Sequence, residues 1–297
     1  MISNERKQIM GNTLYLECYS GISGDMTVAA LIDLGADQIA LNKTLRSLPV
    51  NGFSTEITRV KKAGLDVCDF NVRLEQENHD HDMEYLHAPL HEPRHSHHTE
   101  HNYSVSSNST QPHHHHHRAL DDILSIIKQA DMSDRAKQTA SDIFHILGEA
   151  EAKAHGTSLE NVHFHEVGAI DSIIDIISAA VCLDNLDITD VIIPVLYEGT
   201  GTIRCQHGIL PIPVPATANI LQAHQIPLHI TDTKGEFVTP TGAAISAAIR
   251  TRDSLPEQFC IIRTGLGAGK RTYDRPSILR ASIIEPKKKM ISVKQHL

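Results

Sequence analysis

The chain has 297 residues, of which 40% are hydrophobic and only 4% aromatic, and its formal net charge is −9 with the 21 histidines counted as neutral. This length suits one large domain or two ordinary ones, and the acidic balance argues against nucleic acid as a partner. No signal peptide and no uncharged run of the roughly 20 residues that span a membrane is visible, so we expect a soluble, cytoplasmic protein without a membrane partner.

Five cysteines are scattered along the chain, and no two of them form a Cys-x-x-Cys pair. An odd and dispersed set predicts neither a disulfide framework nor a thiolate zinc knuckle. We expect most of these cysteines to be buried thiols. The surrounding core must be aliphatic, because the chain contains no Trp.

The first predicted lobe, residues 12–75, opens as a strand, a loop and a helix. An apolar run at 14–18 precedes a turn-like segment at 20–25 and a helical pattern at 26–34. A second helical pattern covers 39–48. The β-rich segments 54–60 and 65–74 flank Ala63-Gly64, which predicts a β-hairpin.

Residues 76–117 carry thirteen of the 21 histidines among Asp, Glu, Ser, Asn and Pro. Such a composition cannot bury a core and predicts a flexible loop. The segment ends in His113, His114, His115, His116 and His117. A purification tag is one reading of this run. We favour a native loop that captures Ni or Zn, because tags belong at a terminus and mixed His, Asp and Glu continue upstream.

The main predicted lobe, residues 118–285, is again α/β. Helices are predicted at 120–129, 170–186, 216–223 and 242–250, and at 135–154 with Ser133 as N-cap and Gly156 as C-terminal stop. Strands are predicted at 191–196 and 259–264, the second followed by a glycine-rich run at 265–269. We therefore expect an α/β fold, with α+β as the alternative, in which two lobes with mixed sheets flank the loop and a tail covers 286–297.

The densest group of candidate metal ligands comprises His163, His165, Glu166, Asp171 and Asp175. An extended segment at 162–165 would place both imidazoles on one side, and acids four apart share one helix face. Two imidazoles with carboxylates suit Ni, Zn, Fe or Mn. The alternative is a helix N-terminal charge beside buried, hydrogen-bonded histidines. We favour a metal or acid–base site because all five groups fall within thirteen otherwise hydrophobic residues.

Two glycine-rich segments are candidate phosphate sites. In the first, at 20–25, Gly21, Ser23 and Gly24 precede a predicted helix, where backbone amides and the helix dipole favour anions. A tight turn in which Asp25 caps the helix explains the same residues equally well. The second, with Gly267 and Gly269, is a weaker candidate because glycine turns after strands are common.

Cys205 and His207 form a Cys-x-His pair that a strand would present to one metal ion. A buried cysteine beside a histidine that only packs is the alternative reading.

Five long stretches of the sequence form an ordered pattern. They are LYLECYSGISGDM at 14–26, EAEAKAHG at 149–156, VHFHEVGAIDSIIDI at 162–176, GTGTIRCQHGILPIPVPAT at 199–217 and EFVTPTGAA at 236–244. Together they resemble the LarC family of nickel insertion proteins, and the His-rich insert resembles that family too.

The resemblance implies insertion of nickel into pyridinium-3,5-bisthiocarboxylic acid mononucleotide, in a lyase-class reaction that consumes CTP with Mg or Mn. The product would be the nickel-pincer cofactor of lactate racemase, so the lactate racemase apoprotein is an expected partner and a homo-oligomer the expected assembly. Within this picture Asp25, His163, His165, Glu166 and Asp171 are the expected catalytic residues. Family members continue into a C-terminal domain, which we expect a separate, frameshift-derived part to supply.

Two other functions remain open from the sequence. The His-rich loop also suits a non-catalytic nickel storage or delivery protein, and the His-x-His-Glu cluster also suits a metal-dependent hydrolase. A hydrolase would act without the pyridinium precursor, which separates it from an insertion enzyme.

Overall fold

The computed structural model describes residues 11–75, 118–162, 164, 170–205 and 208–287. The His-rich segment lies outside these residues. The described strands are β1 (Asn12–Glu17), β2 (Phe53–Lys62), β3 (Leu65–Leu74), β4 (Ile188–Ile192), β5 (Leu196–Thr200), β6 (Thr202–Cys205), β7 (Gly208–Pro211), β8 (Leu228–Lys234), β9 (Phe259–Ala268) and β10 (Ile278–Pro286). The described α-helices are α1 (Gly24–Asp33), α2 (Gln38–Ser47), α4 (Leu120–Gln129), α5 (Asp134–His155), α6 (Ile170–Asn185), α7 (Pro215–His224) and α8 (Pro240–Ile249).

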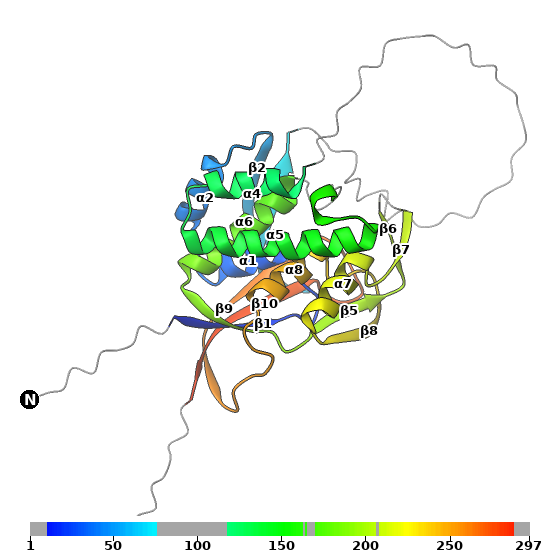
Figure 1. Ribbon diagram of the computed structural model, residues 1–297. Coiled ribbons are helices and arrows are strands. Elements are labelled where there is room, and N and C mark those ends of the chain that lie inside the picture. The colour runs from blue at the N-terminus through cyan, green and yellow to red at the C-terminus, as the bar shows by residue number, and fades with distance from the viewer. Residues whose placement is uncertain (1–10, 76–117, 163, 165–169, 206–207, 288–297) are drawn as a thin grey trace, which may run out of the picture.

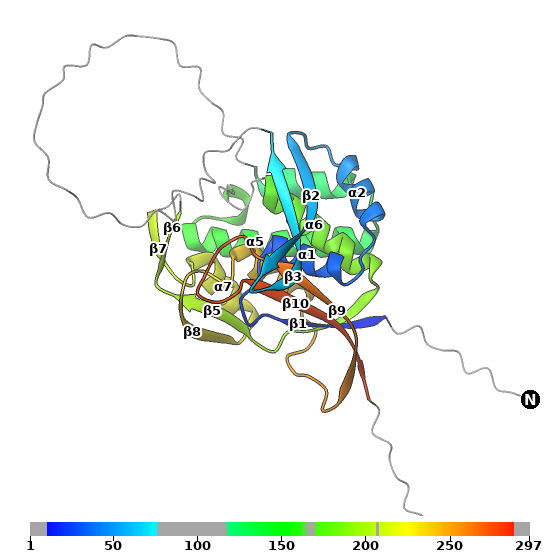
Figure 2. The same cartoon turned by 180° about the vertical axis from the view of Figure 1, so that it is seen from behind.

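A mixed six-stranded sheet in the order β2-β3-β9-β10-β1-β4 forms the centre of the fold. β1 runs antiparallel to β10 and parallel to β4, and β9 pairs antiparallel with β10. Figure 2 shows β2 and β3 continuing the sheet beyond β9. The α/β class expected from the sequence is confirmed, and one sheet takes strands from both sides of the His-rich segment.

The helices pack in layers against this sheet (Figure 1). α1 contacts β9, β3 and β10 directly, and α6 packs on α1. α5 then lies against α6, α7 and α8. In the part of the chain that the structure describes, no helix combines the length and the apolar character needed to cross a bilayer.

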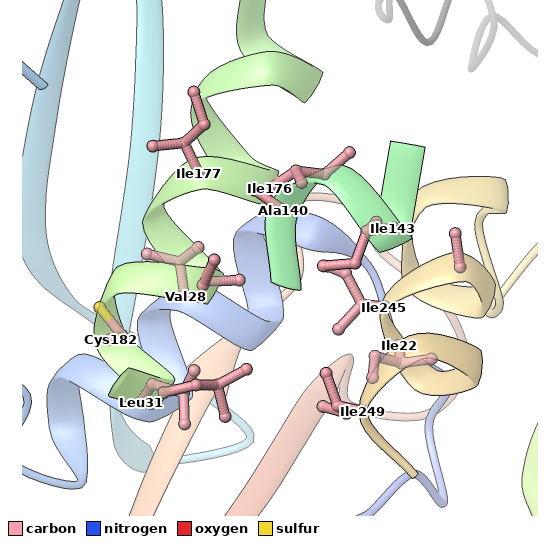
Figure 3. Close-up of a cluster of buried hydrophobic side chains, with 14 of the residues drawn as sticks. Ile22, Val28, Leu31, Ala140, Ile143, Ile176, Ile177, Cys182, Ile245 and Ile249 are labelled. Carbon is pink, nitrogen blue, oxygen red and sulfur yellow. The ribbon is translucent and has the colours of Figure 1, made fainter. Parts of the chain in front are cut away.

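The core is aliphatic, as the composition predicts. Val28 and Leu31 of α1 meet Ile176 and Ile177 of α6, and Ile245 of α8 joins the same cluster (Figure 3). Each of these five side chains is fully buried. Because complete burial of an aliphatic side chain contributes about 1.5–3 kcal/mol, this cluster fixes the start of α1 relative to α6.

Local signals located most helices correctly. The expected hairpin is β2–β3, with Ala63 and Gly64 both at positive φ. Ser133 accepts a hydrogen bond from the Ala136 amide at 3.0 Å and thereby caps α5, and Gly156 ends that helix in the left-handed conformation. These features depend on neighbouring residues, so the sequence pattern was sufficient to find them.

Two strand predictions were wrong in their extent. The strand expected at 191–196 is two strands, because β4 ends at Ile192 and β5 begins at Leu196, with Pro194 between them. The strand expected at 259–264 continues through the glycines to Ala268, because the absence of side chains there lets β9 approach α1 closely. β6, β7, β8 and β10 were not predicted.

Candidate active site

The loop between β1 and α1 is tied to a distant segment that precedes α8. The Ile22 amide donates a hydrogen bond to the Phe237 carbonyl at 3.0 Å, and the Thr239 amide donates to the Ile22 carbonyl at 3.2 Å. A Cβ atom on Gly21 would collide with that same Phe237 carbonyl, and Gly21 has a φ of +84°. Gly21 is therefore required both by its backbone conformation and by this close approach.

Asp25 lies in the first turn of α1. Its Oδ1 accepts hydrogen bonds from the Met26 amide at 2.8 Å and from the Ser23 hydroxyl. The Ser23 side chain makes no capping hydrogen bond to the helix amides, and its hydroxyl donates to the Asp25 carboxylate instead. Asp25 is thus oriented by its own loop, at the positive end of the helix dipole.

Asp175 of α6 lies directly beside this loop. A Cβ atom on Gly24 would come within 2.6 Å of Asp175 Oδ2, so only glycine lets the two segments approach so closely. Oδ1 of Asp175 is buried and has no hydrogen-bond partner among the described residues. Asp171 stands one turn earlier on the same helix, as the spacing of four predicts.

Burial is the main cause that raises the pKa of both carboxyl groups at the loop. The pKa of Asp175 is raised well above its usual value, first by burial and then by the charges of Asp25 and Asp171. The pKa of Asp25 is raised by burial, while its bonds from Ser23 and Met26 act in the opposite direction. The pair therefore holds protons more tightly than exposed carboxyl groups do.

Lys270 supplies the positive charge at this cluster. Its Nζ donates to Asp69 Oδ1 at 2.6 Å, which places the ammonium group between the end of β9 and strand β3. The same charge lowers the pKa of both Asp25 and Asp175. The contact between Lys270 and Asp69 was not predicted. The only sequence signal was a lysine directly after the glycine-rich run at 265–269.

Glu198 is a further buried carboxyl group that the sequence analysis missed. Its side chain has no exposed surface, and Oε1 accepts hydrogen bonds from the amides of Gly199, Phe237 and Val238 at 2.8, 2.6 and 3.3 Å. Burial raises its pKa to about 7, although the amides act in the opposite direction. A glutamate beside two glycines in an apolar strand was the available signal.

The structure places the predicted catalytic residue Asp25 beside the predicted ligand Asp175, and the predicted ligand Asp171 lies one turn from Asp175 on α6. Cys205 is half-buried at the end of β6. Within the described ranges, no group of three or more His, Cys, Asp or Glu side chains is arranged to hold a metal ion. The other predicted ligands, His163, His165, Glu166, His207 and His113 to His117, lie outside the described residues.

The glycines predicted to bind a cofactor are all in close packing contacts. Besides Gly21 and Gly24, Gly267 lies within β9, where a Cβ atom would collide with the Met26 carbonyl of α1. A Cβ atom on Gly269 would meet the side chains of Ser277 and Met26. Close packing around the β1–α1 loop and α1 explains why glycine occupies these positions. That these glycines bind a phosphate stays a prediction.

Comparison with known proteins gives one consistent result. A family model described as "Nickel insertion protein" matches residues 14–296. A "Pyridinium-3,5-bisthiocarboxylic acid mononucleotide nickel insertion protein" from Alkaliphilus metalliredigens is 50% identical over 97% of this chain and 65% of its own length. Proteins of the same name from Acetivibrio thermocellus and Akkermansia muciniphila are 37% and 39% identical over 93% and 92% of this chain, and over 61% and 60% of their own lengths. The chain therefore spans less than two thirds of these relatives. No solved structure matches.

Proposed function

Since the chain belongs to the nickel insertion protein family, we propose that it inserts nickel into pyridinium-3,5-bisthiocarboxylic acid mononucleotide. The observation that carries this proposal is the 50% identity, along 97% of the chain, to the protein of that name from Alkaliphilus metalliredigens. The half-buried pair of Asp25 and Asp175 supports it, because carboxyl groups with a raised pKa can take up a proton that is displaced when the metal binds.

In this proposal nickel is a substrate that the protein passes on. Imidazole and carboxylate groups bind nickel, so His163, His165, Glu166 and Asp171 are the proposed holding ligands. Asp171 supports this role by its place in the first turn of α6, directly after the histidine-containing segment. The two sulfur donors and a ring carbon of the precursor then take over the metal.

The proposed role of Asp25 and Asp175 is to accept a proton. When a nickel–carbon bond replaces a carbon–hydrogen bond on the pyridinium ring, the ring loses one proton and the carbon keeps the electron pair. A carboxylate beside the ring takes up that proton, and a raised pKa favours its uptake near neutral pH. Lys270 lowers the pKa of both groups and so keeps a fraction of the pair ionised.

The family resemblance adds CTP with Mg or Mn. The space beside Gly21 and Gly24 is taken by Phe237 and Asp175, and the carboxylates of Asp25 and Asp175 would repel a phosphate at the loop when they are ionised. The requirement for CTP stays a prediction of the resemblance, and no step described here depends on it.

We further propose that the product is the nickel-pincer cofactor of lactate racemase, with the racemase apoprotein as its recipient. This places the protein among metal-inserting lyases. Because this chain spans less than two thirds of its relatives, we propose that the complete reaction also needs the remaining part of their length.

A single-turnover assay tests the proposal. The purified precursor is mixed with Ni²⁺ and an excess of this chain, with and without CTP, and the nickel product is followed by its absorbance and mass. Asp25→Asn and Asp175→Asn should lower the rate by about a hundredfold or more, since a positioned acid–base group contributes roughly 10²–10⁴. Asp121→Asn, a first-turn acid of α4, is the matched control and should react like the wild type.

The outcomes separate the candidate functions. Nickel binding without any product would support a storage protein and contradict insertion. A precursor-independent hydrolysis would support the metal-dependent hydrolase. Equal rates for Asp25→Asn and Asp121→Asn would remove Asp25 from the reaction. Including the remaining part of a relative in a parallel assay shows whether this chain is active alone.

A further inference from the structure

Glu198 is the carboxyl side chain with the least exposed surface among the described residues, at 0%. A buried carboxylate costs several kcal/mol unless hydrogen bonds compensate it, so such a residue has a structural or functional reason. Oε1 receives three amide hydrogen bonds, whereas Oε2 has no partner among the described residues. Two of these three hydrogen bonds come from one distant stretch of backbone, residues 237–238.

That stretch is the segment that holds the β1–α1 loop. Two of the three amides belong to Phe237 and Val238. The carbonyl of the same Phe237 accepts from the Ile22 amide, and Ile22 pairs with Val238 in an isolated bridge. A single peptide segment, residues 237–238, thus connects Glu198 to the β1–α1 loop. Asp25 follows Ile22 by three residues.

No cation neutralises Glu198 directly in the described surroundings. Glu236 lies next to Phe237, and Arg271 donates to Glu236 Oε2 at 2.6 Å. Tyr273 donates its hydroxyl to the Glu236 carbonyl. The Arg271 guanidinium group therefore pairs with Glu236, and the backbone amides of Gly199, Phe237 and Val238 are the groups that stabilise the charged form of Glu198.

We propose that Glu198 is a positioning residue of the insertion site, which sets the β1–α1 loop and the Asp25 carboxyl group through the amides of Phe237 and Val238. Its importance for catalysis rests on the proposed function, whereas its control of the loop does not. Because Glu198 has no exposed surface, its proposed action on the loop runs through the backbone amides alone.

Amide hydrogen exchange of the intact chain tests the control of the loop. Glu198→Met keeps a side chain of similar length and removes the acceptor oxygens. Peptides covering residues 19–26 and 236–239 should then exchange about tenfold faster or more, while the β2–β3 hairpin should keep its wild-type rate. Glu198→Gln retains one acceptor oxygen and should restore most of the protection.

Asp33→Asn is the matched control. Asp33 Oδ2 also accepts a backbone hydrogen bond, from the Leu266 amide at 2.8 Å, but at the opposite end of α1. This variant should leave exchange at 19–26 unchanged. If Glu198→Met does not fold, Glu198→Asp, which draws the carboxylate back by one methylene, replaces it with the same expected pattern.

The insertion rate gives the second readout. Glu198→Met should lower single-turnover insertion by roughly tenfold to a hundredfold, as misplacement of a reacting group by about 1 Å does. Glu198→Gln should recover most of that loss. Wild-type exchange at 19–26 in Glu198→Met, or equal acceleration in Asp33→Asn, would overturn the proposal. A wild-type chain that inserts no nickel would refute the proposed function, and the exchange pattern would still decide whether Glu198 sets the loop.

Discussion

The backbone of Gly24 and the carboxyl group of Asp175 are in direct contact, although 150 residues separate them in the sequence. A Cβ atom on Gly24 would lie 2.6 Å from Oδ2 and 2.8 Å from Cβ of Asp175. This contact brings the start of α1 to the start of α6 and places Asp25 beside Asp175. The acidic cluster exists because the N-terminus of α1 meets the second turn of α6.

Gly24→Ala should separate the two helix ends. The added methyl group meets the Cβ of Asp175 as well as its carboxylate, so backbone must move, and overpacking of this kind costs about 1–3 kcal/mol. We expect a lower free energy of unfolding in urea and a slower insertion. Gly148→Ala in α5 is the control, because it meets first the flexible end of Leu159 at 2.8 Å. Equal losses in both variants would contradict the special role of Gly24.

Asp175→Asn should be more stable than the wild type at alkaline pH. The pKa of Asp175 is raised in the folded protein, so the folded state binds its proton more tightly than the unfolded state. The contribution of Asp175 to the free energy of unfolding is therefore fully present below its pKa in the unfolded state, about 3.9. It is lost as the pH rises through its pKa in the folded state. Thermal unfolding at several pH values measures this. A stability difference that is independent of pH would refute the shift.

Glu198→Gln should change the pH dependence of stability near neutral pH. The pKa of Glu198 is about 7 in the folded state against an ordinary value of 4.5, with Glu236, Arg271 and Tyr273 as neighbouring charges and titratable groups. Across this range the wild type should lose stability relative to Glu198→Gln by about 1.4 kcal/mol per pH unit at most. Urea unfolding at pH 5, 6, 7 and 8 gives the comparison. A wild type that gains relative stability with rising pH would show the opposite sign.

Lys270→Met should move the pH profile of insertion upward. The ammonium charge lowers the pKa of Asp25 and Asp175, so its removal raises both further and delays their ionisation. The insertion rate should rise with pH as the proton-accepting carboxyl group ionises, and in Lys270→Met we expect this rise at higher pH. Lys270→Arg retains the charge and should follow the wild type more closely. An unchanged profile for Lys270→Met would exclude electrostatic control by Lys270.

The elements that the sequence predicted well depend on residues close together in the chain. The N-cap at Ser133, the left-handed stop at Gly156 and the turn at Ala63-Gly64 each involve contacts within a few residues. Amphipathic periodicity then located α4 and α5 because each buries one face. The family resemblance was equally accessible, since it rests on the order of residues in long motifs.

The composition of the site was only partly accessible. Asp25 and Asp171 were identified because acids stand out at the beginnings of helices, and Asp175 was identified because it follows Asp171 by four residues. The contact of Lys270 with Asp69 and the role of Glu198 were missed because they come from strands and loops that no periodic pattern relates to the first helix. The extension of β9 to Ala268 was missed for the same reason, since glycines indicate a turn until a helix is known to pack on them.

The sequence by itself determined the α/β class, most helices, the hairpin and the family, because these follow from local hydrogen bonding, periodic burial and motif order. Only the tertiary structure decided that Asp25 meets Asp175, that Lys270 holds its charge beside them, and that Glu198 binds the segment anchoring the β1–α1 loop. Those contacts join residues far apart in the chain, and they form only when the aliphatic core packs α1 against α6 and β9.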